Sequence, residues 1–439
     1  MIRFARNTNA RATRSGGTLS CLAGALLCAA PAWADETAAA GEPGGPRLAV
    51  LTKKALLAEL EGTQFIDDAV ILIRDGRIER VGAQDTTAVP EGYESLDLGD
   101  QWVMPGMVDL HSHVGGNTRD YNDMIYQCNP GLRVSTAVVP NHSGLQRAIA
   151  AGVTTILFIP GSGTNIGGQG VLMKTAIETY EGAVLRNPGS LKIAQGDNPT
   201  RWGYRMGRLL MNFHLRDVIE RGMAYATRWE AFEANGGEKP KTDLQFEVFR
   251  DLKAHRTQIS THTQYYQLVM MSIQMLAVDY GLDVFIDHGS FDSYLNTDRA
   301  IEHNVAAILG PREVMFSRPP RFDTDGQVHG AAWGFQQRGH TRIGFNTDAT
   351  VVPQESLSLQ AAMGVRYGMD DRNMDGVRGL TIIPAITAGI ADRVGSIEAG
   401  KDADLLVVTG DPCDPRTAVE CVLIEGRVVY DTASERRRW

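Results

Sequence analysis

Short apolar stretches alternate with helical ones through the middle of the chain, and this alternation restricts the fold more than any other feature. Residues 153–159, 190–194 and 258–263 are typical of buried strands. Residues 206–235 and 266–280 have the length and apolar spacing of helices. Because strands that alternate with helices favour parallel pairing, we expect an α/β protein whose sheet closes into a barrel. Further barrel strands are expected at residues 107–110, 283–288, 305–309 and 342–348.

β-rich segments lie on both sides of this alternating region. Residues 69–82 contain Asp75-Gly76 between two strand-like runs, which is a hairpin signal. Residues 422–430 contain Glu425-Gly426 at a second expected turn. Strands from the two ends of a chain can form one small sandwich, and the length of 439 residues allows a large barrel beside it.

Two histidines end the first expected barrel strand. The apolar run 107–110 is followed by His111 and His113. Positions i and i+2 of a strand share a face, so both imidazoles point the same way. Neutral imidazoles are common metal ligands, although a His-x-His pair alone is equally typical of a surface loop.

Three more polar side chains end later strands, namely His262, His288 and Asp348. Functional residues of a (β/α)8 barrel lie where its strands end at the carboxyl face. Four histidines and one aspartate in this order therefore favour a metal centre over separate structural roles.

Two motifs resemble the amidohydrolase superfamily. The first, residues 105–113, reads P-G-M-V-D-L-H-S-H, and the second, residues 381–412, is similar to the closing segment of that family. The resemblance implies a (β/α)8 TIM barrel with a small β-sandwich domain formed from both ends of the chain. The expected divisions are a signal peptide at 1–34, a flexible leader at 35–46, sandwich parts at 47–104 and 394–435, and the barrel at 105–393.

The resemblance also implies roles for the strand-end residues. His111, His113, His262, His288 and Asp348 would hold metal, and Asp348 would also be the general base. Relatives with two metals, expected here to be Zn²⁺, often bridge them through a carbamylated lysine on the fourth strand.

Lys192 on the expected fourth strand is the candidate for this carbamylated lysine, with Lys174 as the alternative. Desolvation disfavours an ammonium group, so a lysine buried between metals can react with carbon dioxide and become an anionic ligand. A surface lysine at a strand edge is the plain alternative.

The implied activity is metal-dependent hydrolysis of an amide or related C–N bond in an acyl amino acid, a small peptide or a cyclic amide. A deaminase, a lactonase and a non-catalytic periplasmic binding protein are the alternatives. The resemblance is to the imidazolonepropionase-like or Xaa-Pro dipeptidase-like branch of the superfamily. Within it, Gln169 in the glycine-rich segment 160–170, expected to be a loop, stands where dipeptidase-like relatives have a histidine, which argues against a dipeptidase. Arg205, Tyr265 and Tyr266 are the candidate substrate contacts.

The first 34 residues have the pattern of a secretory signal, with a basic start, an apolar stretch and a small-x-small site ending at Ala34. Cleavage after Ala34 predicts a periplasmic or secreted protein without stable membrane insertion. It also removes four arginines and no acid, so the net charge falls from −9 to −13. That charge argues against nucleic acid as the main partner. The expected partner is a small-molecule substrate, and a homo-oligomer is compatible with the sequence. Cys413 and Cys421 are expected to form a disulfide after export.

Overall fold

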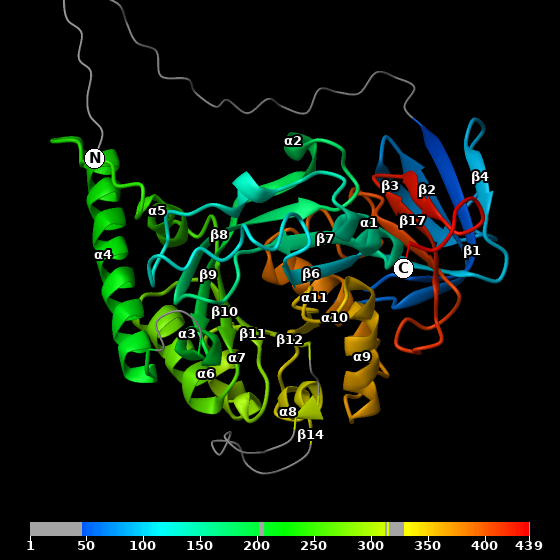
Figure 1. Cartoon of the computed structure of the whole chain (residues 1–439). Helices are drawn as coiled ribbons and strands as arrows, with labels where there is room; N and C mark the ends of the chain where they lie inside the picture. The colour runs from blue at the N-terminus through cyan, green and yellow to red at the C-terminus, as the bar shows by residue number, and fades with distance from the viewer. Residues whose placement is uncertain (1–45, 202–205, 312–313, 316–328, 439) are drawn as a thin grey trace, which may run out of the picture. The chain divides into compact units, whose positions relative to one another are not determined.

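The computed structural model describes residues 46–201, 206–311, 314–315 and 329–438, which include two eight-stranded sheets. One sheet holds the middle of the chain and forms a nearly closed barrel, as expected (Figure 1). Its strand order is β15-β12-β11-β10-β9-β8-β7-β6, and an isolated parallel bridge between Ser112 and Ala349 joins the chain at its two edges. The barrel strands are β6 (Met107–Ser112), β7 (Val153–Phe158), β8 (Ile166–Lys174), β9 (Val184–Gln195), β10 (Ile259–Thr263), β11 (Val284–His288), β12 (Ala306–Leu309) and β15 (Ile343–Phe345).

Strand β8 departs from the expected parallel arrangement because it runs antiparallel to both β7 and β9. The segment between β7 and β8 is too short for a crossover helix, so the chain turns back directly. The glycine-rich segment expected as a loop therefore ends as strand, and residues 166–170 belong to β8. A Cβ on Gly170 would lie 2.7 Å from Ile159 Cγ2, so this glycine permits close packing.

Helices connect the remaining strands and pack on the barrel. The expected helix 206–235 is α4 (Arg208–Asn235), which packs with α5 (Glu247–Lys253) through a cluster that includes Leu215 and Phe249. The expected helix 266–280 divides into α6 (Tyr266–Ser272) and a π-helix, η2 (Ile273–Asp279). The others are α1 (Ser143–Ala150), α2 (Tyr180–Ala183), α3 (Asp197–Arg201), α7 (Thr297–Glu302), α8 (Ala331–Gln336), α9 (Leu357–Arg366), α10 (Asp375–Leu380) and α11 (Ile382–Thr387).

The second sheet combines strands from both sides of the barrel segment, as the sequence predicts (Figure 1). Strand β5 pairs antiparallel with β16 and joins the two contributions. Asp75 and Gly76 both have positive φ, as do Glu425 and Gly426, which is the geometry of two-residue hairpin turns. The strands are β1 (Arg47–Leu56), β2 (Phe65–Arg74), β3 (Arg77–Ala83), β4 (Glu94–Asp97), β5 (Trp102–Pro105), β16 (Leu405–Val408), β17 (Val419–Ile424) and β18 (Arg427–Asp431).

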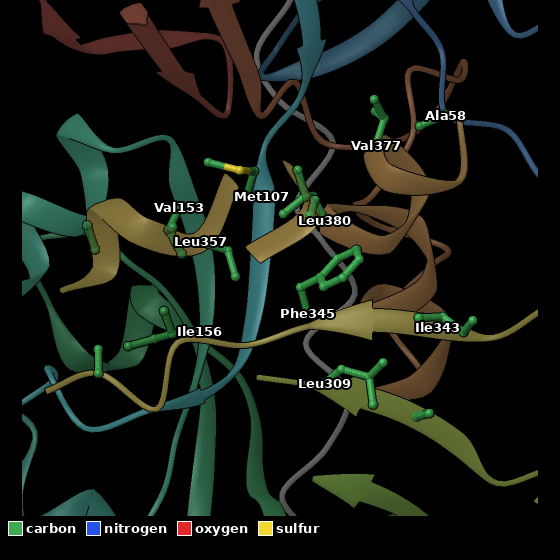
Figure 2. Close-up of a cluster of buried hydrophobic side chains, with 14 of the residues drawn as sticks. Ala58, Met107, Val153, Ile156, Leu309, Ile343, Phe345, Leu357, Val377 and Leu380 are labelled. Carbon is green, nitrogen blue, oxygen red and sulfur yellow. The ribbon is translucent and has the colours of Figure 1, made fainter. Parts of the chain in front are cut away.

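A large apolar cluster holds the first and last barrel strands against the closing helices. Figure 2 shows Met107 and Phe345 from the strands together with Leu357 and Leu380 from the helices α9 and α10. All four side chains are buried. This packing fixes β6 and β15, the two strands that are followed by His113 and Asp348.

The expected disulfide between Cys413 and Cys421 is absent, since both cysteines are free in the structure. Cys413 packs against the apolar cluster that contains Met107, whereas Cys421 lies on β17 in a separate cluster of the second sheet. Nearness in sequence therefore does not bring the two sulfur atoms together. Within the described residues, no helix has the length and apolar character needed to cross a membrane.

Candidate metal centre

Polar side chains from five barrel strands gather at the carboxyl ends of those strands. His111 ends β6, Lys192 lies near the end of β9, His262 lies on β10, and His288 ends β11. Asp348 follows β15. His113 lies just beyond β6. The four histidines and Lys192 are almost fully buried, and Asp348 is slightly more exposed.

Two histidines and one carboxylate form the first group of potential ligands. Asp348 Oδ1 lies 3.2 Å from His111 Nε2 and 3.3 Å from His113 Nε2. The two Nε2 atoms are themselves 3.2 Å apart. Nitrogen and oxygen atoms that converge in this way could share one cation, and the geometry follows from the i, i+2 spacing at the end of β6.

His262 and His288 form a second pair, with His288 Nε2 2.7 Å from His262 Nδ1. His262 Nε2 is buried and has no hydrogen-bond partner among the described residues. A buried imidazole nitrogen without a partner costs free energy, which a bound cation would offset. His288 reaches the centre because its backbone has a φ of 82°, which departs from the extended conformation of β11.

Backbone carbonyl groups orient two of these rings. His113 Nδ1 donates a hydrogen bond to the Ile159 carbonyl at 2.8 Å, and His288 Nδ1 donates one to the Gly310 carbonyl, also at 2.8 Å. Each bond places a ring proton on Nδ1, so that Nε2 of the neutral ring carries a lone pair instead of a proton. Second contacts of this kind are typical of metal-binding histidines.

Asp287, which the sequence analysis did not single out, lies at the centre of the group. Its Oδ2 is 2.7 Å from His111 Nδ1 and 2.9 Å from Lys192 Nζ. Lys192 Nζ also lies 3.5 Å from His111 Nε2. The sequence did hold one signal for Asp287, namely an acidic residue within an apolar strand-like run, directly before His288.

Lys174, the alternative to Lys192, lies elsewhere. Its Nζ contacts Asp402 Oδ2 at 2.7 Å, Asp404 Oδ1 at 3.2 Å and Glu425 Oε1 at 3.0 Å. Lys174 is fully buried, and it ties β8 to the second sheet. The geometry therefore favours Lys192 as the lysine of the centre.

The charges of the centre suit a cation. Burial raises the pKa of Asp348, but His111 and His113 outweigh it and hold that pKa well below its usual range. Burial also raises the pKa of Asp287, but His111 and Lys192 outweigh it and hold that pKa low. Burial lowers the pKa of His288 to about 4 and that of His262 well below its usual value, so both rings are neutral. Burial disfavours charge on His111 too, but Asp287 raises the pKa of His111 to about 9.

Asp109 is a second residue that the sequence analysis did not assign. Its Oδ1 accepts a hydrogen bond from the His111 backbone N–H at 2.9 Å. Its Oδ2 accepts bonds from the Thr347 hydroxyl at 2.6 Å and from Gln354 Nε2 at 2.5 Å. These contacts hold the end of β6 beside the segment that carries Asp348, so Asp109 is a positioning residue.

The candidate substrate contacts differ in their surroundings. Tyr265 is buried, its ring stacks on Phe291, and its hydroxyl donates to Asp197 Oδ2 at 2.9 Å. Tyr266 is 39% exposed at the start of α6. Arg205 lies outside the described residues. A cavity of about 230 Å³ adjoins His113 and Ala349 and extends to Arg147 on α1.

Comparisons with known proteins agree with this architecture. A model of the amidohydrolase family matches residues 331–429. The crystal structure of an amidohydrolase from Thermotoga maritima MSB8 is 27% identical, covers 88% of this chain and 100% of its own, and superposes with a TM-score of 0.77. The chain belongs to the amidohydrolase superfamily. The comparisons thus support a hydrolase family for this chain, and the barrel and second sheet described above agree with the amidohydrolase fold.

Two relatives from the curated proteins show how far the likeness extends. An imidazolonepropionase of Sphingopyxis alaskensis is 25% identical over 388 residues, which cover 82% of this chain and 92% of the relative. The amidohydrolase tasK of Hapsidospora irregularis is 26% identical over 403 residues, again 82% of this chain. The chain spans only 40% of the length of tasK, so the activity of that whole protein does not transfer.

Proposed function

We propose that this chain is a metal-dependent hydrolase that cleaves an amide or related C–N bond in a small molecule. The observation that carries the proposal is the group of His111, His113 and Asp348, whose ligand atoms lie within reach of one cation. The His262–His288 pair lies beside this group, and His262 Nε2 has no hydrogen-bond partner among the described residues. Acyl amino acids, small peptides and cyclic amides are the proposed substrate class. The imidazolonepropionase relatives make imidazolonepropionate the first cyclic substrate to test.

The donor set fits two divalent metals, which we propose to be Zn²⁺ because histidine nitrogen and carboxylate oxygen are ligands that zinc accepts. His111, His113, His262, His288 and Asp348 would hold them. Bound metal would supply an activated water and polarise the substrate carbonyl.

Asp348 would accept the proton of the attacking water and pass it to the leaving nitrogen. Its low pKa, held down by His111 and His113, means that Asp348 is ionised, as a proton acceptor must be. The nearby Tyr266, and Arg205 in the undescribed segment, stay the proposed substrate contacts. Tyr265 has its hydroxyl on Asp197, so we propose that it supports the site by packing.

Lys192 would bridge the metals as a carbamate. In the structure its Nζ forms an ion pair with Asp287 at 2.9 Å. A carbamate is anionic and would turn this attraction into repulsion, so we propose that carbamylation requires metal and is lost when metal is removed. Supplying bicarbonate during metal loading should therefore raise both metal content and activity.

The test combines elemental analysis with a hydrolysis screen of the full chain. We expect about two metals per chain and turnover of N-acyl amino acids, dipeptides or cyclic amides, but slower turnover of amidines and lactones. Preferred turnover of an amidine or a lactone would instead assign a deaminase or a lactonase. Tight binding of these compounds without turnover by metal-loaded protein would reject the hydrolase and favour a binding protein.

Export remains part of the proposal. Residues 1–34 lie outside the described residues, and the argument rests on their basic, apolar and small-residue pattern. N-terminal sequencing of protein recovered from the periplasm should begin at Asp35. Recovery of the intact chain from the cytoplasm alone would reject the signal.

A further inference from the structure

A polar cavity of about 350 Å³ lies at the end of the barrel opposite the metal centre. Its walls come from residues at or just before the first residues of four strands. Arg186 lies near the start of β9, Gln258 precedes β10, Asp283 precedes β11, and Arg342 precedes β15. At their carboxyl ends, β9, β10 and β11 carry Lys192, His262 and His288, and β15 is followed by Asp348. The length of each strand therefore separates the cavity from the metal centre.

Two partly buried arginines face this cavity without a carboxylate partner. Neither Arg186 nor Arg342 has an acidic oxygen within ion-pair distance among the described residues. Arg186 donates Nη2 to the Gly189 carbonyl at 2.9 Å, and Arg342 donates Nη1 to the Asn304 carbonyl at 3.1 Å. Their Nε atoms are enclosed and also lack a protein acceptor in the described part of the chain. Arg342 Nη1 also donates to Asn304 Oδ1. Arg186 Nη1 and Arg342 Nη2 therefore have no protein acceptor among the described residues and can bond a ligand.

Two further features suit a ligand that accepts hydrogen bonds. Gln258 is 7% exposed, and its Nε2 has no acceptor among the residues described. Gly389 lies beside Arg186, and a Cβ at this glycine would be 3.3 Å from Arg186 Nη1. The absence of a side chain at residue 389 leaves that guanidinium nitrogen uncovered.

The charges that face the cavity favour an anion. Asp283 is the single carboxylate among the described residues that line the cavity, and its Oδ2 lies 2.9 Å from His255 Nδ1. His303 also lines the cavity, 3.9 Å from Glu302. Burial lowers the pKa of both arginines and Asp283 raises it, which is the expected response of cations that lack a close counter-ion.

We propose that this cavity binds a small oxyanion, a phosphate or a carboxylate group, between Arg186 and Arg342 with Gln258 as a third donor. Guanidinium groups match the planar or tetrahedral oxygen arrangement of such anions, and bonds to charged groups are stronger than neutral ones. The cavity also lies within the size range of small-molecule sites. Ligand binding here does not depend on hydrolysis at the metal centre.

Calorimetric titration of the full chain with inorganic phosphate, and separately with succinate, tests the proposal. We expect saturable binding of at least one of the two, and the comparison tells a phosphate ligand from a carboxylate ligand. Arg186→Gln and Arg342→Gln should each weaken the binding by about tenfold or more, because each removes a charge-assisted hydrogen bond. Asp283→Asn should have the opposite effect and tighten binding severalfold, because it removes the one negative charge in the cavity.

Arg80→Gln is the matched control, because Arg80 is an exposed arginine on β3 of the other sheet and its loss changes the net charge equally. It should leave the affinity within about twofold. Absence of binding would overturn the proposal. So would binding that Arg186→Gln, Arg342→Gln and Asp283→Asn all leave unchanged, since the anion would then sit elsewhere, for example at the metal centre. The Asp283 variant keeps the test decisive if an arginine variant does not fold.

Discussion

The two ends of the barrel strands have opposite electrostatic character. At the carboxyl ends, ionised Asp348 and Asp287 lie among histidines, and this arrangement suits a cation. At the amino ends, neither Arg186 nor Arg342 forms an ion pair with a described residue, and this arrangement suits an anion. On β10 the two environments are separated by the four-residue step from Gln258 to His262, which is about 13 Å of extended chain. Each strand thus brings residues of two unlike proposed sites close together in sequence, and we expect the two sites to be electrostatically independent.

The largest expected effect belongs to the carboxyl end. Asp348→Asn should lower kcat about a hundred- to ten-thousand-fold, because an amide cannot accept the proton that general base catalysis requires. Turnover of a substrate found in the screen is the measurement, and metal content should be determined on the same sample. If turnover stays near normal, Asp348 is not the general base.

The two buried lysines should fail in different ways. Lys192→Ala should lose metal and activity. Lys174→Ala should keep metal but lose roughly 3–5 kcal/mol of unfolding free energy, because it leaves buried Asp404 without an ion-pair partner among the described residues, while Asp402 keeps its pair with Arg393. Denaturant unfolding and elemental analysis of both variants check this contrast. Metal loss in the Lys174 variant alone would move the bridging role to that residue.

Acid should destabilise the fold through His340, which belongs neither to the metal centre nor to the proposed anion site. Burial lowers the pKa of His340 to about 4, below the ordinary 6.5 of the unfolded chain. The unfolded state then binds more protons between those values, so stability is present above pH 6.5 and falls as the pH drops toward 4, by at most about 3 kcal/mol. His340→Gln should flatten that part of the stability profile, measured in metal-loaded protein. An unchanged slope would contradict the assignment.

The smallest expected effect tests the independence of the two ends. Asp283→Asn should change turnover by less than about twofold, because its charge lies on the far side of the barrel and exposed charges at that distance are screened. Turnover should be measured with and without phosphate at physiological ionic strength. A large change would show that the two ends are coupled and would break the comparison.

Local rules predicted much of the carboxyl end. The i, i+2 rule placed His111 and His113 on one face, and strand ends marked His262, His288 and Asp348, which the structure brings together; their roles as ligands stay predictions. Asp287 was missed because its importance depends on contacts with His111 and Lys192, which come from other strands.

Other features depend on tertiary structure that no local pattern encodes. The antiparallel direction of β8 follows from the short connection after β7, which the sequence analysis interpreted as a loop. The predicted disulfide was wrong because closeness in sequence does not determine which apolar cluster each cysteine joins. The amino-end cavity has no motif. Arg186 and Arg342 are isolated in sequence and become neighbours of one cavity only when the barrel closes.

The pairing of β5 with β16 has a consequence for how the chain is made. Val103 pairs with Val407, so the partners emerge from the ribosome roughly 300 residues apart, and a contact of such sequence separation forms late. Until β16 to β18 are synthesised, β5 presents an open edge to solvent, and open edges invite pairing with other chains. Nascent chains therefore need protection through almost the whole of translation, and a chain that stops before residue 405 should aggregate even though all of its barrel strands are present.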